Sequence, residues 1–237
     1  FGLVEAQGLA GRIEESFVRR VETLSDDARR LLLLAAAEPV GDPLLLLAGS
    51  ERLGIAVSAV DTETDGLLAV GERVTFRHPL VRSAVYRTAT REQRREVHLA
   101  LAAATDRSVD PDRRAWHRSR TVDGPDEPIA GELERSADRA RARGGVAAAA
   151  AFLERATELT PDPTRRGARA LSAAQAKFDE AQHKLETACY AGMVGLLGVE
   201  DRTERITRRE LYRRFSRIGE AVVDVAERIV YAVVKQS

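Results

Sequence analysis

Apolar residues recur along this chain with the spacing of helices. The first stripe advances by steps of three or four residues: Ile13, Phe17, Val21 and Leu24. This spacing places the four side chains on one face of a helix. Ser25 and the two aspartates behind it are typical of an N-cap followed by an acidic first turn. The segment from Ala28 to Ala37 is very apolar, so we expect a buried second helix there.

Two shorter helices are predicted next. Asp42 and Pro43 are typical of the N-cap and first position of a helix, and Gly54 is typical of a residue that ends one. We therefore expect a helix up to about Leu53 and another from Ser58 to Thr64.

A strand-like pattern then replaces the helical one. Leu67–Val70 and Val74–Phe76 are typical of strands, and Gly71–Arg73 is typical of the turn between them. A two-stranded hairpin is not stable alone, so this one must lie against the helices. Several helices followed by one small hairpin are the signature of a winged helix. Helical periodicity resumes over Ser83–Arg87 and in a longer helix that Thr90 caps.

The following part is predicted to contain helical hairpins. Asp110 and Pro111 begin one helix. From Glu127 to Pro161 we expect an αα-hairpin that turns at Gly144 and Gly145. Its small residues match the positions at which the two helices of a tetratricopeptide (TPR) repeat approach closely: Ala137, Ala149 and Ala156.

The last stretch predicts one long amphipathic helix from about Thr207 to Val234. Its apolar positions alternate steps of four and three: Leu211, Phe215, Ile218, Val222, Val225, Ile229 and Val233. Arginines crowd its start: Arg202, Arg205, Arg208, Arg209, Arg213, Arg214 and Arg217. Such a stripe suits a helical bundle or coiled coil.

These patterns together predict a mainly α chain in three parts. The first is a winged-helix domain with one small β-hairpin over residues 1–107. TPR-like helical hairpins follow over residues 108–186, and a C-terminal helical segment occupies residues 187–237.

Composition narrows the function classes. The 237 residues include 37 basic and 37 acidic side chains, so the net charge is zero, which argues against a surface that binds nucleic acid or acidic lipid throughout. The single cysteine, Cys189, excludes an internal disulfide and a cysteine-built zinc site. No apolar run reaches the roughly 18 residues of a membrane span. No signal peptide is evident, so we expect a cytoplasmic location and no membrane partner.

The motifs of common catalytic sites do not occur in the sequence. It has no GxxxxGK[ST] phosphate loop, no GxGxxG after a strand, no HExxH and no CxxC. Ser50 lacks the second glycine of a nucleophile elbow. The four histidines are scattered: His78, His98, His117 and His183. We therefore predict no enzyme activity, no catalytic residue, no metal site and no cofactor held by this chain itself.

His78 is the most informative single residue. It lies in the segment Phe76–Leu80, where the hairpin passes into a helix. A histidine at such a junction can donate a hydrogen bond to an anion, or it can cap the helix. Both interpretations stay open at this point.

Five segments occur in an order that resembles a known family: Gly8–Glu14, Leu31–Glu38, Phe76–Tyr86, Asp112–His117 and Ala151–Ala156. Over roughly residues 1–182 the chain is similar to the large actinobacterial LuxR-type regulators with an amino-terminal ATPase, which are signal-transduction ATPases with numerous domains. That family joins an ATPase, a winged helix, TPR-like repeats and a DNA-binding helix-turn-helix. The resemblance implies ATP or ADP in the parent protein, with His78 as a sensor of the nucleotide phosphates and Arg77 beside it as a second contact.

The end of the chain resembles a different family. Residues 208–235 are similar to the last helix of PhoU-like phosphate-transport regulators. Because only that helix is present, the metal sites of the family are not carried over. The change of resemblance near Ala181–Tyr190 suggests a chimera, and the start at Phe1 suggests a fragment.

Our first hypothesis is a non-catalytic regulatory fragment of a LuxR-type ATP-dependent regulator. It would contact the ATPase and helix-turn-helix domains of the parent protein, sense nucleotide state and self-associate through its C-terminal helix. Two alternatives stay open: a PhoU-like helical scaffold that regulates phosphate transport, and a stand-alone DNA-binding winged helix. Since Arg73 and Val74–Phe76 form no basic wing, we expect this fragment not to bind DNA.

Overall fold

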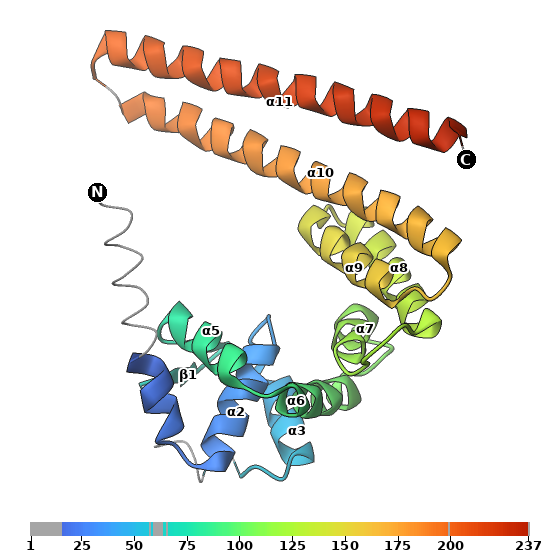
Figure 1. The fold of residues 1–237 in the computed structure, drawn as a ribbon. Coiled ribbons are helices and arrows are strands. Elements are labelled where there is room, and N and C mark those ends of the chain that lie inside the picture. Colours follow the sequence, from blue (N-terminus) through green and yellow to red (C-terminus); the bar gives the residue numbers. More distant parts are fainter. Residues whose placement is uncertain (1–15, 57, 59–63, 65, 199, 237) are drawn as a thin grey trace. The chain divides into compact units, whose positions relative to one another are not determined.

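The structure is a computed structural model that describes residues 16–56, 58, 64, 66–198 and 200–236. Most of it is helical, with one two-stranded antiparallel hairpin and a long C-terminal helix, so the predicted mainly α class is confirmed. The chain divides into two compact units, Phe1–Asp123 and Gly124–Ser237 (Figure 1). Ile13, the segment 8–14 and most of the helix predicted over 58–64 lie outside the described residues.

Helix α2 (Asp26–Ala37) is the centre of the first unit. The Ser25 side chain accepts a hydrogen bond from the Ala28 N–H at 3.2 Å and begins the helix as predicted. Eight of its twelve residues are buried, among them the continuous apolar run Leu31–Ala37. Helices α3 (Pro43–Arg52), α5 (Pro79–Thr88) and α6 (Arg91–Ala104) pack around it.

Local capping sets the starts of these surrounding helices. Asp42 caps α3, with Pro43 in the first turn, as the sequence predicts. Thr90 caps α6 in a reciprocal capping box with Gln93. Helix α5 begins at Pro79, earlier than the predicted Ser83, because His78 caps it.

The predicted hairpin is present as β1 (Leu68–Val70) and β2 (Val74–Phe76), with Ala69 opposite Thr75. Leu68 and Val74 are buried in the helical core, which supplies the support that two strands need. Gly41, with φ +73°, accepts a hydrogen bond from the Val74 N–H at 2.8 Å. A Cβ at Gly41 would overlap the Val74 carbonyl, so only glycine lets the α2–α3 turn approach β2 this closely.

Helix α7 (Pro111–Ser119) completes the first unit and packs on α6. The first unit therefore extends to Asp123, whereas the sequence placed the end of the winged helix at residue 107. The side chains of His98 on α6 and His117 on α7 are in contact within this unit.

The second unit begins with an antiparallel pair, α8 (Glu127–Ala142) and α9 (Val146–Leu159), in the position predicted for the αα-hairpin. Gly144, with φ +74°, forms the turn. Ala137, Ala149 and Ala156 are each at most 1% exposed. The small residues therefore lie where the helices pack closely, as expected from their spacing.

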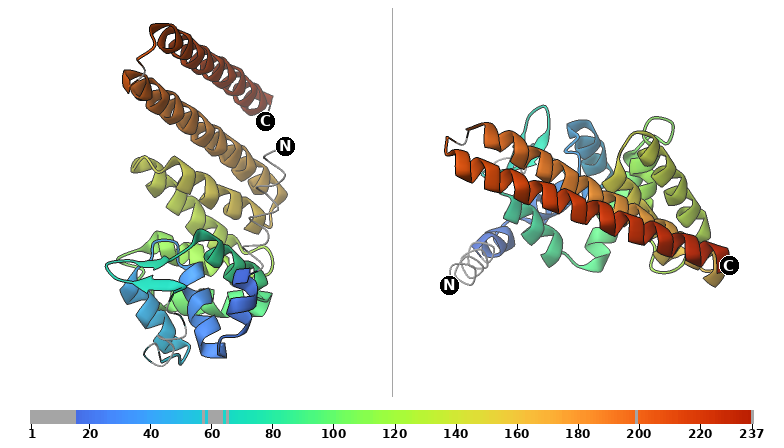
Figure 2. Two further views of the ribbon diagram at one scale, coloured as in Figure 1. Left: turned by 90° about the vertical axis from the view of Figure 1, so that its left-hand side faces the viewer. Right: turned by 90° about the horizontal axis from the view of Figure 1, so that it is seen from above.

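The remainder of the second unit is a hairpin of two long helices, α10 (Pro163–Gly195) and α11 (Arg202–Gln236), joined through a short 3-10 turn at Leu196–Gly198. They run side by side in opposite directions (Figures 1 and 2). The first turns of α10 pack against α9. Because α10 is continuous for 33 residues, the boundary predicted after residue 186 falls inside a helix.

Arg169 connects three helices of this unit. Its guanidinium donates to both carboxylate oxygens of Glu127 at 2.9 Å, to Glu134 at 2.9 Å and to the Thr160 hydroxyl at 2.8 Å. The hydrogen bond from Arg169 lowers the pKa of Glu127 despite the opposing effect of desolvation. Glu127, and then Glu134, raise the pKa of Arg169. These two glutamates hold α10 to α8, and the contact with Thr160 holds it to the end of α9.

Candidate functional site

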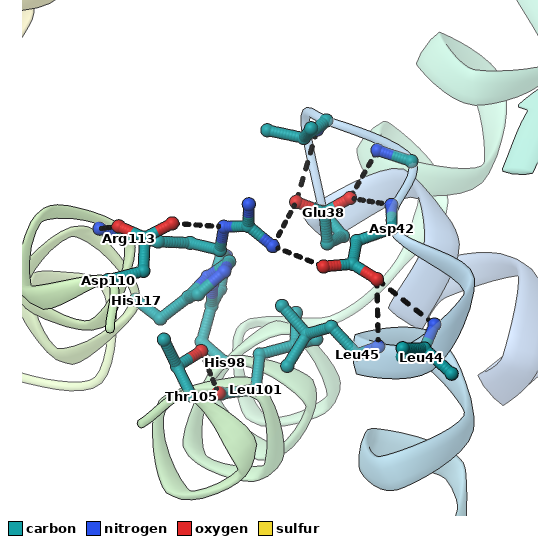
Figure 3. Close-up of polar contacts among 12 residues, drawn as sticks. Glu38, Asp42, Leu44, Leu45, His98, Leu101, Thr105, Asp110, Arg113 and His117 are labelled. Atoms are coloured by element: carbon teal, nitrogen blue, oxygen red, sulfur yellow. Dashed lines mark hydrogen bonds and ion pairs between the residues drawn. The ribbon is translucent and has the colours of Figure 1, made fainter. Parts of the chain in front are cut away.

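A partly buried polar centre joins α7 to the turn between α2 and α3 (Figure 3). Arg113 of α7 donates from Nη1 to Asp42 at 3.0 Å and pairs through Nε with Asp110 at 3.0 Å. Its Nη1 also lies 3.9 Å from the Glu38 carboxylate. Glu38, only 3% exposed, in turn accepts from the backbone N–H groups of residues 40, 41 and 42.

Each aspartate in this centre has two roles. Asp42 accepts from the first N–H groups of α3 with one oxygen and from Arg113 with the other. Asp110 does the same for α7. Burial alone would raise the pKa of Asp42, but the backbone hydrogen bonds and Arg113 together lower it. The described donors and carboxylates of this centre are paired with one another. We therefore assign it a structural role and not a ligand-binding one.

A second buried group lies beside it: a chain of hydrogen bonds through two histidines. Tyr86 Oη is 3.0 Å from His98 Nε2, and His98 Nδ1 is 3.0 Å from His117 Nδ1. Tyr86 comes from α5, His98 from α6 and His117 from α7. His98 is 2% exposed and His117 is fully buried.

Both histidines are held neutral. Burial lowers the pKa of His98 to about 3, with further contributions from His117, Arg120 and Arg94. Burial and then Arg113 lower the pKa of His117 to about 4, against an opposing effect of Asp110. Because the two Nδ1 atoms share one proton, one histidine donates and the other accepts. In either tautomer, His117 Nε2 has no hydrogen-bond partner in the described structure.

A surface pocket of ≈ 460 Å³ opens above this pair, and we call it the arginine pocket. Its lining residues come from the end of α2, from α5, α6 and α7, and from the residues that follow α2 and α7. They are Ala36, Ala37, Pro39, Arg82, Ser83, Tyr86, Arg87, His98, Trp116 and Arg120. Arg82 donates to the carbonyls of Ala36 and Glu38 at the end of α2. The Arg120 guanidinium lies 4.2 Å from the centre of the Trp116 ring.

The two residues singled out as nucleotide contacts lie away from this pocket's lining. His78 is exposed, its Nδ1 accepts from the Leu80 N–H at 3.2 Å, and its ring lies 5.2 Å from that of Phe17. The structure thus shows the helix-capping role that the sequence left open. Arg77 is exposed, and its backbone N–H donates to the Leu67 carbonyl. Nucleotide sensing by either residue stays a prediction.

His98 and His117 are far apart in the sequence, and no sequence pattern points to the arginine pocket. The two histidines are 19 positions apart on different helices, so only the packing of α6 against α7 brings them together. The i, i+4 spacing of Trp116 and Arg120 is the one local signal that could have pointed to their stacking, and nothing in the sequence points to the residues of α5 beside them.

Helix α11 carries a second feature of functional interest. Among the described residues, the face that it turns to α10 carries the half-buried Tyr212, Ser216, Gly219 and Val223. Its most apolar side chains lie one position earlier and are between 45% and 58% exposed: Leu211, Phe215, Ile218, Val222 and Val225. We call these five residues the α11 stripe. An apolar groove of ≈ 240 Å³ runs beside it, with Phe178 and Leu185 of α10 in its other wall.

Glycines set this orientation of α11. A Cβ on Gly219 would lie 2.5 Å from Leu185 Cδ2, and one on Gly192 would overlap the Tyr212 ring. The two helices therefore approach through glycine positions, which leaves the larger apolar residues at the side.

No family model, curated protein or solved structure matches this chain. In the described part of the chain, no three His, Cys, Asp or Glu side chains gather as a metal site would require. Among the same residues, no helix combines the length and apolarity that crossing a membrane demands.

Proposed function

We propose that this chain is a non-catalytic regulatory module of the LuxR-type ATPase regulators that it resembles, and that it works through protein–protein contacts. In this proposal the first unit contacts the ATPase and helix-turn-helix domains of the parent protein. The α10–α11 hairpin pairs with the same hairpin of a second copy.

The observation that carries the proposal is the exposure of the α11 stripe. Five large apolar side chains with steps of four and three residues lie about half exposed on one side of a regular helix. This is the spacing of a bundle seam, and packing against α10 uses the neighbouring face instead. A second hairpin would cover the stripe and the adjacent groove and complete a four-helix bundle.

Charge favours a second copy as the occupant. Residues 202–217 contain seven arginines and two glutamates, whereas residues 218–227 contain Glu220, Asp224 and Glu227 and no basic residue. Two copies of α11 in antiparallel orientation place each arginine-rich start near the acidic segment of the other. The surface is therefore complementary to itself.

The test is the oligomeric state of the chain by sedimentation velocity over a range of concentrations. We expect a monomer–dimer equilibrium that Ile218→Asp weakens by at least about tenfold, because a carboxylate would be buried in an apolar seam. Ile206→Asp is the matched control. Ile206 is 56% exposed against 58% for Ile218, and it lies nearly opposite the stripe at 3.6 residues per turn.

Circular dichroism of both variants checks that the helices are retained. A chain that stays monomeric at every concentration would contradict the proposal. Equal weakening by Ile206→Asp and Ile218→Asp would contradict it as well, since the stripe would then have no special role.

A further inference from the structure

The start of α11, at the end of the α10–α11 hairpin, carries a row of four arginines on one helix face (Figure 1). They follow at i, i+3, i+7 and i+11, and we call them the arginine face: Arg202, Arg205, Arg209 and Arg213. All four are exposed, and in the described part of the chain none of their side chains makes an ion pair or a hydrogen bond. The other three arginines of residues 202–217 pair with Glu204 or Glu210. The arginine face is therefore a row of cations without local counter-charges.

The surroundings of the arginine face do not compensate its charge. Residues 187–198, the end of α10 and the 3-10 turn, contain no charged side chain. Residues 187–217 together contain seven arginines and four carboxylates, an excess of three positive charges in a chain whose net charge is zero. Cations in the first turn of a helix also oppose its dipole, so helix stability does not account for Arg202 and Arg205. An anionic partner would account for them.

A small pocket between the two long helices shows which face of α10 adjoins the arginine face. Glu186 of α10 and Glu220 of α11 are among its lining residues, and these carboxylates mark where the basic region ends. Arg213 and Arg209 lie seven and eleven residues before Glu220, so they share its face of α11. Met193 lies seven residues after Glu186 and shares its face of α10. Met193 and the arginine face are therefore on the same side of the hairpin.

Large apolar side chains are exposed beside these arginines. Tyr190 is 68% exposed, Met193 is 41% exposed and Ile206 is 56% exposed. Tyr190 lies one turn before Met193 on α10, and Ile206 lies one turn from both Arg202 and Arg209 on α11. An occupant of this surface must therefore offer negative charge and an apolar layer together.

We propose that this end of the hairpin binds the surface of a bilayer that contains anionic lipids. The guanidinium groups would lie among the lipid headgroups, and the three apolar side chains would enter the boundary between headgroups and acyl chains. Tyr190 suits that depth, because its ring is apolar and its hydroxyl is polar. The phosphate backbone of a nucleic acid would match the arginines, but it would leave the three apolar side chains in water.

Such binding agrees with the rest of the molecule. The expectation of no membrane partner rests on the lack of a membrane span, whereas a helix that lies on the surface needs none. Ile206 lies nearly opposite the α11 stripe, so a second copy that covers the stripe leaves the arginine face accessible. The proposal therefore goes beyond the proposed function and does not depend on it.

The test is co-sedimentation of the full chain with lipid vesicles. One set of vesicles is phosphatidylcholine alone, and the other contains about 30% phosphatidylserine to supply the negative surface potential. We expect binding to the anionic vesicles, at least about tenfold weaker binding to the neutral ones, and weaker binding to the anionic vesicles in about 500 mM NaCl.

A first pair of variants tests the arginines. The double variant Arg209→Gln, Arg213→Gln should weaken binding to the anionic vesicles by at least about tenfold, since each arginine near such a surface contributes about fivefold. The matched control is the double variant Arg52→Gln, Arg73→Gln, which removes the same charge from exposed positions of the first unit. We expect this control to bind as the unchanged chain does.

A second pair tests the apolar layer. Ile206→Asp should weaken binding to the anionic vesicles by at least about tenfold, because it places a carboxylate between the arginines and the acyl chains. The control is Val109→Asp, which makes the same kind of exchange at an 80% exposed position of the first unit. Circular dichroism and the thermal midpoint show whether each variant is folded.

Four outcomes would overturn the proposal. The first is no binding to the anionic vesicles, and the second is equal binding to the anionic and neutral ones. The third is an equal loss of binding in a variant and its control. The fourth is a duplex oligonucleotide that binds the chain through Arg209 and Arg213 while the vesicles do not, which would make the arginine face a nucleic-acid contact. None of these results requires the chain to dimerise, so they are distinguishable from failure of the proposed function.

Discussion

At the scale of single residues, the buried histidine pair has the clearest consequence. His98 and His117 share one hydrogen bond at 3.0 Å and are 2% and 0% exposed, so each proton added to the neutral pair would place a positive charge on a buried ring. Arg113 and Arg120 would repel that charge. The pair is therefore compatible with the fold only while it carries no charge.

We predict that acid destabilises the first unit through this pair. In the unfolded chain both histidines titrate near 6.5, whereas in the folded chain their pKa values are about 3 and about 4. Between about pH 6.5 and about pH 4 the unfolded chain binds protons that the folded chain does not, so stability falls as pH falls. Above about pH 7 both states are neutral and the pair gives no pH dependence.

Urea unfolding at about pH 7.5 and about pH 5, followed by Trp116 fluorescence, measures this effect in the first unit. The free energy of unfolding should be lower at the acid pH by about 4 kcal/mol, about 2 kcal/mol from each histidine's pKa shift. The double variant His98→Leu, His117→Leu should lose most of that difference, whereas His183→Leu, an exposed site, should keep it. An unchanged acid response in the double variant would assign the effect to other groups.

At the scale of elements, Arg169 shows how one side chain can stabilise a helical hairpin against a third helix. Its side chain is 8% exposed and its partners are Glu127, Glu134 and Thr160. Arg165, one turn earlier on the same helix, also pairs with Glu127 but is 67% exposed. The two arginines therefore make the same kind of contact in different surroundings.

We predict that Arg169→Met lowers the free energy of unfolding of the second unit by about 1–3 kcal/mol, because the Thr160 hydroxyl and two carboxylates lose a shared donor. Arg165→Met should cost at most about 0.5 kcal/mol, the usual contribution of an exposed ion pair. The measurement is chemical unfolding followed by circular dichroism, since the second unit contains no tryptophan. Equal effects of the two substitutions would show that burial of Arg169 contributes nothing.

The elements also show how far the sequence could predict this fold. Helix starts were predictable because their signals are local: an aspartate cap followed by proline begins α3, α7 and α10. The hairpin and the small residues between α8 and α9 were predictable for the same reason. The histidine pair and the arginine pocket were not, because they depend on how α5, α6 and α7 cross.

Helix α11 could be predicted from the sequence only in part. Its apolar spacing predicted an amphipathic helix, and the structure confirms the helix over Arg202–Gln236. Which face meets α10 could not be predicted, because hydrophobicity favours the α11 stripe while close approach occurs at Gly219 and Gly192. Here backbone proximity, not apolar content, selects the contact face.

At the scale of the whole molecule, the net charge is zero, but the charged residues are unevenly distributed along the chain. The arginine-rich start of α11 and the acidic segment after it lie within one helix. If two copies pair through the α11 stripe, this distribution selects their relative direction. Antiparallel copies bring opposite charges together, and parallel copies bring the two arginine-rich starts together.

We predict that added salt weakens the dimer several-fold between about 20 mM and about 500 mM NaCl, because screening removes the attraction between antiparallel copies. Sedimentation velocity measures the dissociation constant at each salt concentration. Leu211→Cys, in a background with Cys189→Ala, gives an independent check. Parallel copies place the two new thiols side by side and form a disulfide on oxidation, whereas antiparallel copies keep them apart. The antiparallel arrangement would be contradicted by a dimer that becomes tighter with added salt and crosslinks at residue 211. Such a dimer would be parallel, and its hydrophobic seam would hold the copies together against charge repulsion.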